Sequence, residues 1–164
     1  MKNIYLFSKS FLMTAALLLA MQTANAQCGQ RYHDKIFQDS VVSNIQYGAN
    51  LKMNNQNQNL LLDIYFPMGD SQTDRPLFII AHGGNFLGGS KTGVDVINFV
   101  KDFSRMGYVA SSIEYRVGMT GFPVPGPDST DAGEAVMRAV HDMRAAVRFF
   151  KDSYANGNPY GIDT

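Results

Sequence analysis

The sequence predicts an α/β domain with a mostly parallel sheet, an antiparallel edge and helices on both faces. From residue 77 onward, strand-like segments alternate with helix-like segments, an order typical of a parallel sheet. Two further strand-like segments come before residue 67 and lie close together, which favours an antiparallel hairpin at one edge. The segment 77–81 is apolar at every position and therefore indicates a strand buried on both faces.

Four strands are expected, at residues 42–47, 60–66, 77–81 and 108–115. Gly48 ends the first of them. The second is the clearest, because apolar side chains recur at every other position until Pro67 ends the run. A link rich in turn-forming residues then leads to the third strand.

Two helices are expected, at residues 92–105 and 132–154. Gly107 is a good stop for the first. In the second, apolar residues at helical spacing form a stripe expected to face the core: Val136, Val140, Met143, Val147 and Phe150, with Ala139 and Ala146 filling in. The connection at 116–130 is rich in glycine and proline, and it is either a substrate mouth or a plain surface link.

Residues 1–26 have the features of a secretory signal peptide. A basic start at Lys2 and Lys9 precedes a short apolar stretch. Ala24-Asn25-Ala26 then matches a small-x-small cleavage site, which predicts a cut after Ala26. The apolar stretch is shorter than the ~20 residues that a bilayer span needs. We therefore expect a secreted or periplasmic protein with no stable membrane span.

The mature chain, residues 27–164, is expected to form one domain. Removing Lys2 and Lys9 leaves 12 basic residues against 14 acidic ones. This near balance does not point to nucleic acid or an anionic membrane as a partner. The single Cys28 of an exported chain is either free or paired outside this sequence.

The most informative segment follows the apolar strand at 77–81. His82-Gly83-Gly84-Asn85 begins a glycine-rich loop that leads into the first expected helix. Glycines let the backbone come close to a ligand and turn its N–H groups outward. Two such groups can hold the negative oxygen that forms when an ester or amide carbonyl is attacked. The loop is therefore a candidate oxyanion hole.

This loop resembles the oxyanion loop of α/β-hydrolase carboxylesterases and lipases, which often reads His-Gly-Gly-Gly. Asn85 stands where the third glycine is usual. Further segments resemble the same family in the same order, at residues 113–116, 142–150 and 160–163. The resemblance covers most of residues 41–164. It implies the N-terminal part of an α/β-hydrolase, truncated before the nucleophile strand.

The resemblance also implies roles for the residues of the loop. The N–H groups of Gly84 and Asn85 are the implied main oxyanion donors, and Gly83 shapes the turn. His82 is implied to pack and hydrogen-bond beneath the loop and not to act as the catalytic base. Asn85 must adopt unusual backbone angles there, which asparagine tolerates better than most residues.

Two other motifs nearly match this segment. A phosphate-binding loop needs lysine directly after its second glycine, but Ser90 separates Gly89 from Lys91. A nucleophile elbow, Gly-x-Ser-x-Gly, needs a final glycine, and Thr92 takes that place. Ser90 is therefore expected to be a helix cap or a loop hydroxyl.

Metal and cofactor binding are not indicated. The three histidines, His33, His82 and His141, show no metal-ligand spacing and there are no paired cysteines. His141 and Asp142 are expected on a solvated or ion-paired face of the second helix. No cofactor is expected.

The expected function of the parent protein is that of an exported serine carboxylesterase or lipase-like hydrolase acting on a small ester. In this family the serine, the acid and the base follow the second helix, so residues 27–164 alone are expected to be inactive. They are also expected to be poorly soluble, because the apolar strand at 77–81 would form an open edge. Two alternatives stay open, a non-catalytic binding or adhesion domain of the same fold and a peptidase.

Overall fold

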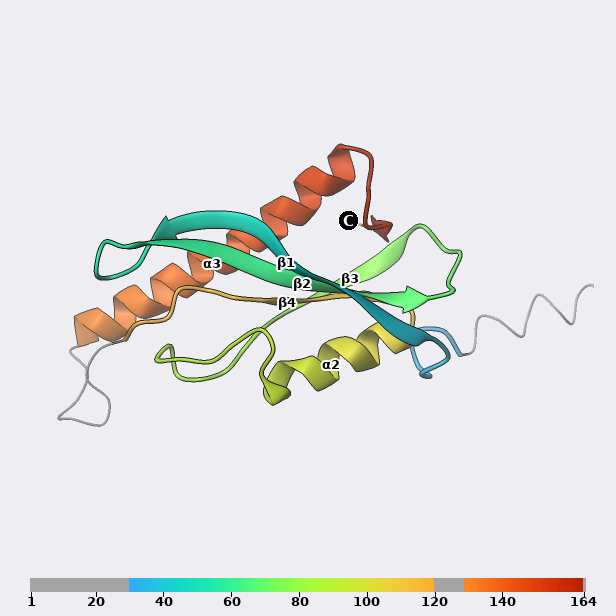
Figure 1. Ribbon diagram of the computed structural model, residues 1–164, viewed down its shortest axis with the longest axis horizontal. Helices are drawn as coiled ribbons and strands as arrows, with labels where there is room; N and C mark the ends of the chain where they lie inside the picture. The colour runs from blue at the N-terminus through green and yellow to red at the C-terminus, as the bar shows by residue number, and fades with distance from the viewer. Residues whose placement is uncertain (1–29, 120–128, 164) are drawn as a thin grey trace, which may run out of the picture.

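The computed structural model of the protein describes residues 30–119 and 129–163 (Figure 1). The expected signal peptide, Cys28 and most of the loop at 116–130 lie outside the described residues. The described elements follow in the order β1 (Gln38–Leu51), β2 (Asn57–Met68), β3 (Arg75–Ala81), α2 (Val94–Arg105), β4 (Val109–Ile113), α3 (Ser129–Ala155) and β5 (Ile162–Asp163).

The strands form one mixed sheet in the order β1-β2-β4-β3-β5. The expected antiparallel hairpin is present as β1 and β2, and β4 also pairs antiparallel with β2. Parallel pairing joins β3 to β4 and to β5. The antiparallel part of the sheet therefore includes β4 as well as the hairpin of β1 and β2.

A helix covers each face of the sheet, as expected (Figure 1). Alternation along β2 sends Leu62 and Ile64 to the face where Ala146 and Phe150 of α3 pack. Tyr65 points to the other face, toward a smaller cluster that contains Val100 of α2. The core is therefore divided between the two faces of the sheet.

Burial of β3 differs from the expectation, because all seven of its residues are only half-buried. The strand pairs with β4 from Leu77 to Ala81, but with β5 only at Arg75 and Pro76. The second edge of β3 beyond Pro76 has no neighbouring strand among the described residues. The apolar sequence therefore predicted the strand correctly, but its prediction that both faces are buried is wrong.

The apolar stripe expected on α3 is correct at Ala146 and Phe150, which are buried, and wrong at its three valines. The residues that are buried are Ala135, Asp142, Ala146 and Phe150. Val136, Val140 and Val147 are 40%, 43% and 38% exposed. The buried stripe is set by Phe150, which enters the core, and by an ion pair that draws the Asp142 carboxylate inward.

Within the described ranges, neither helix is long and apolar enough to cross a membrane.

Candidate functional site

The glycine-rich loop lies between β3 and α2, at the carboxyl end of β3. β3 ends at Ala81, and His82 is the first residue of the loop. In parallel sheets of α/β proteins, this end of the strands is where ligands bind. The position of the loop in the fold therefore fits a ligand-binding role.

The backbone of the loop turns sharply through three consecutive residues with positive φ. These angles are 120° at Gly84, 53° at Asn85 and 61° at Phe86. The N–H of Leu87 donates to the Gly84 carbonyl at 2.9 Å and closes a four-residue turn. Positive φ at both central residues is typical of a type I′ turn, and a phenylalanine there is strained. Stored strain of this kind clusters at functional sites.

Two glycines of the loop have no room for a side chain. A Cβ on Gly84 would lie 2.2 Å from the Gly88 carbonyl oxygen, and a Cβ on Gly89 would lie 2.1 Å from Nδ1 of His82. Both residues also have positive φ, which L side chains rarely adopt. The glycines are therefore needed for the turn itself, whatever the loop binds.

The first three glycine-loop N–H groups after His82 differ in whether they have an acceptor. The Gly83 N–H donates to Oδ2 of Asp95 at 2.8 Å. Asp95 lies in the first turn of α2, where a carboxylate is favoured by the helix dipole. No acceptor among the described residues takes the N–H of Gly84 or Asn85. These two neighbouring donors are available to a ligand that carries negative charge.

A cavity of about 440 Å³ lies against these donors. Its loop side is formed by residues 81–86 and Tyr115. Its other side is formed by one face of α3, through Val136, Ala139, Val140 and Met143. The cavity is therefore mostly apolar, with the loop backbone and the side chains of His82, Asn85 and Tyr115 as its polar part. In such surroundings a hydrogen bond to a developing charge is stronger than in water.

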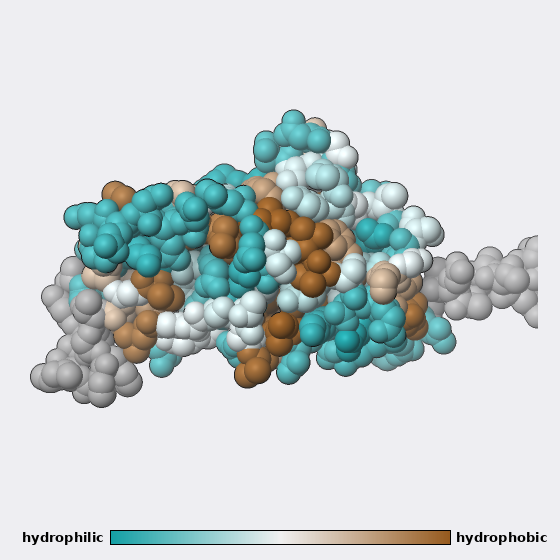
Figure 2. Space-filling model, in the orientation of Figure 1, coloured by the Kyte–Doolittle hydropathy of each residue, from teal (hydrophilic) through white to brown (hydrophobic). Residues whose placement is uncertain are grey.

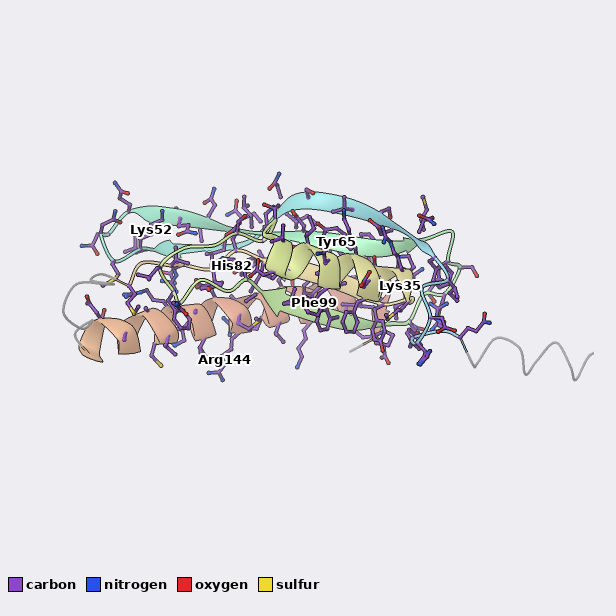
Figure 3. All side chains as sticks on the ribbon, turned by 90° about the horizontal axis from the view of Figure 1, so that it is seen from below. Lys35, Lys52, Tyr65, His82, Phe99 and Arg144 are labelled. Atoms are coloured by element: carbon purple, nitrogen blue, oxygen red, sulfur yellow. The ribbon has the colours of Figure 1, made fainter. Side chains whose placement is uncertain are left out.

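His82 is buried beneath the loop, with 4% of its surface exposed (Figure 3). Its Nδ1 lies 2.8 Å from the Gly83 carbonyl oxygen. The Tyr115 hydroxyl donates to the His82 carbonyl at 2.9 Å, and the two rings stack with 4.3 Å between centroids. Burial raises the pKa of Tyr115, and the Asp95 and Glu114 carboxylates act in the same direction. The phenol therefore stays protonated and keeps its hydrogen bond.

Glu114 holds the far end of the same loop. One of its oxygens, Oε1, accepts hydrogen bonds from the Ser90 hydroxyl and the Lys91 N–H, both at 3.0 Å. Its other oxygen, Oε2, lies 3.5 Å from Nε2 of His82. A single carboxylate thus contacts the first residue of the loop and two residues at its end.

A buried ion pair anchors the loop to the sheet. Lys91 is 6% exposed, and its ammonium lies 2.8 Å from both carboxylate oxygens of Asp63 in β2. Asp63 also accepts the N–H of Asn44, at an irregularity in β1. The loop is therefore fixed to two strands through one lysine.

Ser90 has the character of a loop hydroxyl. Its Oγ donates to Glu114 and accepts the Thr92 N–H at 3.2 Å. The first turn of α2 has no side-chain cap from its N-cap residue, Gly93. No histidine contacts the Ser90 hydroxyl, so no general base is in place to activate it.

Asp142 lies in an ion pair, which is one of the two environments that the sequence predicted for its face of the helix. Its partner is distant in sequence. Arg116 donates to both oxygens of the Asp142 carboxylate, which is 2% exposed. This pair ties α3 to the segment that follows β4. Within the described part of the chain, no group of three His, Cys, Asp or Glu side chains could hold a metal ion.

Sequence reasoning identified the loop and missed the carboxylates that support it. Asp63, Asp95 and Glu114 each contact the loop or its end. The one available signal was polarity in an apolar context, because Asp63 lies between Leu62 and Ile64 in a strand that is otherwise buried.

Comparisons with known proteins assign the chain a family and a fold. The sequence model of the BD-FAE family matches residues 62–164, which include the whole loop and its supports. No curated protein matches the chain at a significant level.

Solved structures of esterases have a similar fold. Esterase B from Lactobacillus rhamnosis, inhibited by a C6-C4 SN3 compound, has a TM-score of 0.50 and 18% identity over 95% of this chain and 40% of its own. Brefeldin A esterase, described as a bacterial homologue of human hormone sensitive lipase, has a TM-score of 0.50 and 14% identity over 90% of this chain and 36% of its own. A truncated carbohydrate esterase from gut microbiota has a TM-score of 0.50 and 18% identity over 79% of this chain and 37% of its own.

At these identities the solved structures share the fold with this chain, and the chain spans less than half of their length. The family match covers well over half of the chain. The chain therefore belongs to the BD-FAE family and has the α/β-hydrolase fold of the esterases, of which it spans a part.

Proposed function

We propose that this chain supplies the oxyanion-stabilising loop of an exported serine carboxylesterase or lipase-like hydrolase that acts on ester bonds. One observation carries the proposal. The N–H groups of Gly84 and Asn85 have no acceptor among the described residues, and they border an apolar cavity of about 440 Å³. Asp95 occupies the Gly83 N–H, which supports Gly84 and Asn85 as the pair of donors.

The chemistry follows from those two donors. Attack on an ester carbonyl converts its oxygen into an anion, and donors aimed at that oxygen lower the barrier. Losing one such donor typically costs about 3–4 kcal/mol of transition-state stabilisation. The donors belong to a loop held at both ends, so little reorganisation is needed when the charge develops.

The proposal places the nucleophile in a strand that continues from β5. Ile162 pairs in parallel with Arg75, and a strand continued in this register comes level with Ala81 about six residues later. Ala81 is the residue immediately before the loop. A serine in the turn after such a strand would have its side chain close to the two oxyanion donors. This register supports a serine arriving from that direction.

The cavity also supports a small ester as the substrate. The α3 side of the cavity is lined by valine, alanine and methionine side chains, which suit a short acyl group. Export is proposed from the signal-peptide pattern at residues 1–26. Mass spectrometry of the secreted or periplasmic protein should then find Gln27 at its N-terminus, and an intact Met1 would contradict export by this route.

The decisive experiment uses the full gene product that carries this chain. We expect hydrolysis of p-nitrophenyl acetate and irreversible labelling by a fluorophosphonate, which reacts with activated serines. Hydrolysis without labelling would contradict a serine mechanism. If a folded protein showed neither hydrolysis nor labelling, the proposal of an enzyme would be contradicted. The alternative of a binding or adhesion domain would then be favoured.

A further inference from the structure

We propose that Arg116 is a positioning residue for the glycine-rich loop. It fixes the segment after β4, residues 116–119, and this segment holds the strained turn of the loop through the Phe86 carbonyl. The turn presents the N–H groups of Gly84 and Asn85. The consequence for catalysis rests on the proposed function, because it concerns these two donors, whereas the contacts themselves do not depend on what the loop binds.

Phe86 is held in a backbone conformation that large side chains avoid. Its φ is 61°, in the left-handed region, and it follows two further residues with positive φ. A positive φ is a genuine outlier for a bulky residue. Such strain persists only where the surrounding structure over-determines the backbone. The contacts of Phe86 with the rest of the fold should therefore account for the turn.

The segment after β4 supplies such contacts at the Phe86 carbonyl. This oxygen accepts the N–H of Gly118 at 2.8 Å and the N–H of Met119 at 3.0 Å. The Phe86 ring also lies edge-on to the Tyr115 ring, with 6.2 Å between centroids. Phe86 is therefore fixed at its carbonyl and at its side chain, and relaxation to a negative φ would disturb both.

The other supports of the loop flank this turn. Asp95 holds the N–H of Gly83 before it, and Glu114 and Lys91 fix the end of the loop after it. The Phe86 carbonyl belongs to the turn itself. The segment 116–119 therefore acts at the point where the strain is stored.

Gly118 allows two successive N–H groups to reach one oxygen. Its φ is 137°, which L side chains rarely adopt. A Cβ at this position would have room, since its nearest neighbours are atoms of Met53 at 3.9 Å. The backbone conformation, and not a lack of space, therefore requires glycine here.

Arg116 anchors the segment to α3 and to the end of β1. Its backbone N–H donates to Oδ2 of Asp142 at 2.9 Å. Its guanidinium donates to the same carboxylate through Nε at 2.9 Å and Nη2 at 2.7 Å, and Nη1 donates to the Leu51 carbonyl at 2.9 Å. Val117 alone separates this residue from Gly118. A residue fixed at main chain and side chain thus sets the position of the donors that follow it.

The ion pair is better suited to fixing geometry than to adding stability. Arg116 and Asp142 are 5% and 2% exposed, and the cost of burying two charges offsets much of their attraction. The planar guanidinium, however, directs several hydrogen bonds in fixed directions at once, which a lysine ammonium does not. Lysine in place of Arg116 should therefore keep the charge and lose the geometry.

The first test is Arg116→Lys in the full gene product. We expect the kcat for p-nitrophenyl acetate to fall about 10- to 100-fold with little change in KM, because a misplacement of about 1 Å costs about 10²-fold. Arg31→Lys is the matched control, since it changes a bidentate pair with Asp70, which also binds Arg75 at the opposite end of β3. It should lower the midpoint of urea unfolding and leave kcat unchanged.

Gly118→Ala tests the same segment without changing the buried charges, and it decides the matter if Arg116→Lys does not fold. We expect a similar fall in kcat, because the strained backbone should move its donors away from Phe86. Gly69→Ala is the control, since Gly69 has a positive φ of 81° and open space around it, in the turn after β2. Equal kcat values in these two variants would overturn the catalytic role of the segment.

Hydrogen exchange separates this proposal from the proposed function. The Leu87 N–H closes the turn on the Gly84 carbonyl, so its exchange rate reports whether the turn holds. We expect faster exchange at Leu87 in Arg116→Lys and Gly118→Ala, and in neither control. Unchanged exchange would overturn the positioning of the loop. Faster exchange in a protein without esterase activity would uphold the positioning and sink the proposed function.

Discussion

Lys91 shows how one side chain fixes the loop in place. Its ammonium is enclosed with the Asp63 carboxylate, and both residues are nearly fully buried. A buried charge is costly unless it is paired, so each partner makes the burial of the other tolerable. The pair lies at the end of the loop and beside the irregularity in β1. Loss of the Lys91–Asp63 pair should therefore affect both the loop and the irregular part of β1.

Lys91→Met tests this pair. We expect a loss of about 3–5 kcal/mol in the free energy of unfolding, because the Asp63 carboxylate is left buried without its partner. Urea denaturation followed by circular dichroism measures it. Lys52→Met removes an exposed lysine and serves as the control. Equal midpoints for the two variants would contradict a structural role for the Lys91–Asp63 pair.

The residues of the site were predictable in unequal degree. Gly84 and Asn85 were predicted as candidate donors because a short motif follows an apolar strand, which is local information, and their role stays a prediction. The partners of Lys91, Ser90 and Gly83 are Asp63, Glu114 and Asp95, and the first two of these are 28 and 23–24 positions away. Contacts at such separations leave no spacing pattern in one sequence.

At the scale of the elements, α3 is the most instructive. Its length, its position and the burial of Ala146 and Phe150 were predicted from helical spacing, and the burial of Asp142 was not. Valines at 136, 140 and 147 suggested the buried stripe, but the burial of Asp142 against Arg116 turns a neighbouring stripe inward. Hydrophobic spacing cannot show that a charged residue has a buried partner. The strands were predicted better, because alternation along β2 is a direct consequence of its two-sided packing.

A second ion-pair cluster joins the N-terminal segment to the start of β3. Asp70, in the turn after β2, accepts hydrogen bonds from Arg31 and Arg75. Burial acts to raise the pKa of Asp70, but the bonds from the two arginines outweigh it and hold the pKa well below the usual 3.8. A lowered pKa in the folded state means that the ionised form stabilises the fold above the usual pKa. This stabilisation is lost as the pH falls.

Asp70→Asn tests the cluster through pH. At neutral pH we expect a loss of about 1.5–3 kcal/mol, the usual contribution of hydrogen bonds to a charged group. The difference from wild type should shrink as the pH falls below about 4, because the Asp70 carboxyl of the unfolded chain then takes up a proton while that of the folded chain stays ionised, which favours unfolding of the wild type. Thermal unfolding across this pH range measures it, with the exposed Asp34→Asn as control. A difference that is constant with pH would contradict the ionic character of the cluster.

At the scale of the whole molecule, one apolar edge of the sheet has no neighbouring strand within residues 30–119 and 129–163. β3 has a single strand partner beyond Pro76, and exposed valines of α3 border the cavity at its carboxyl end. Figure 2 shows other apolar patches among the hydrophilic surface of the face it presents. Open strand edges and large apolar patches promote association between chains.

Residues 27–164, produced alone, should therefore self-associate. Sedimentation velocity should find oligomers or aggregates that dissociate when Val140→Lys places a charge on the apolar side of the cavity. Val94→Lys changes a valine on α2 that is 81% exposed, and it should leave the association unchanged. A monodisperse monomer in the unmodified chain would contradict the open edge.

The most direct test of the proposed oxyanion role compares three substitutions in the full gene product, by the kcat for p-nitrophenyl acetate. Gly84→Ala places a Cβ 2.2 Å from the Gly88 carbonyl oxygen, and it should lower kcat about 10²–10³-fold. Asn85→Gly keeps the N–H and favours the positive φ, and Gly133→Ala lies in open space on α3, so both should stay close to wild type. A fully active Gly84→Ala, or a large loss in Asn85→Gly, would contradict a role for the backbone of this loop.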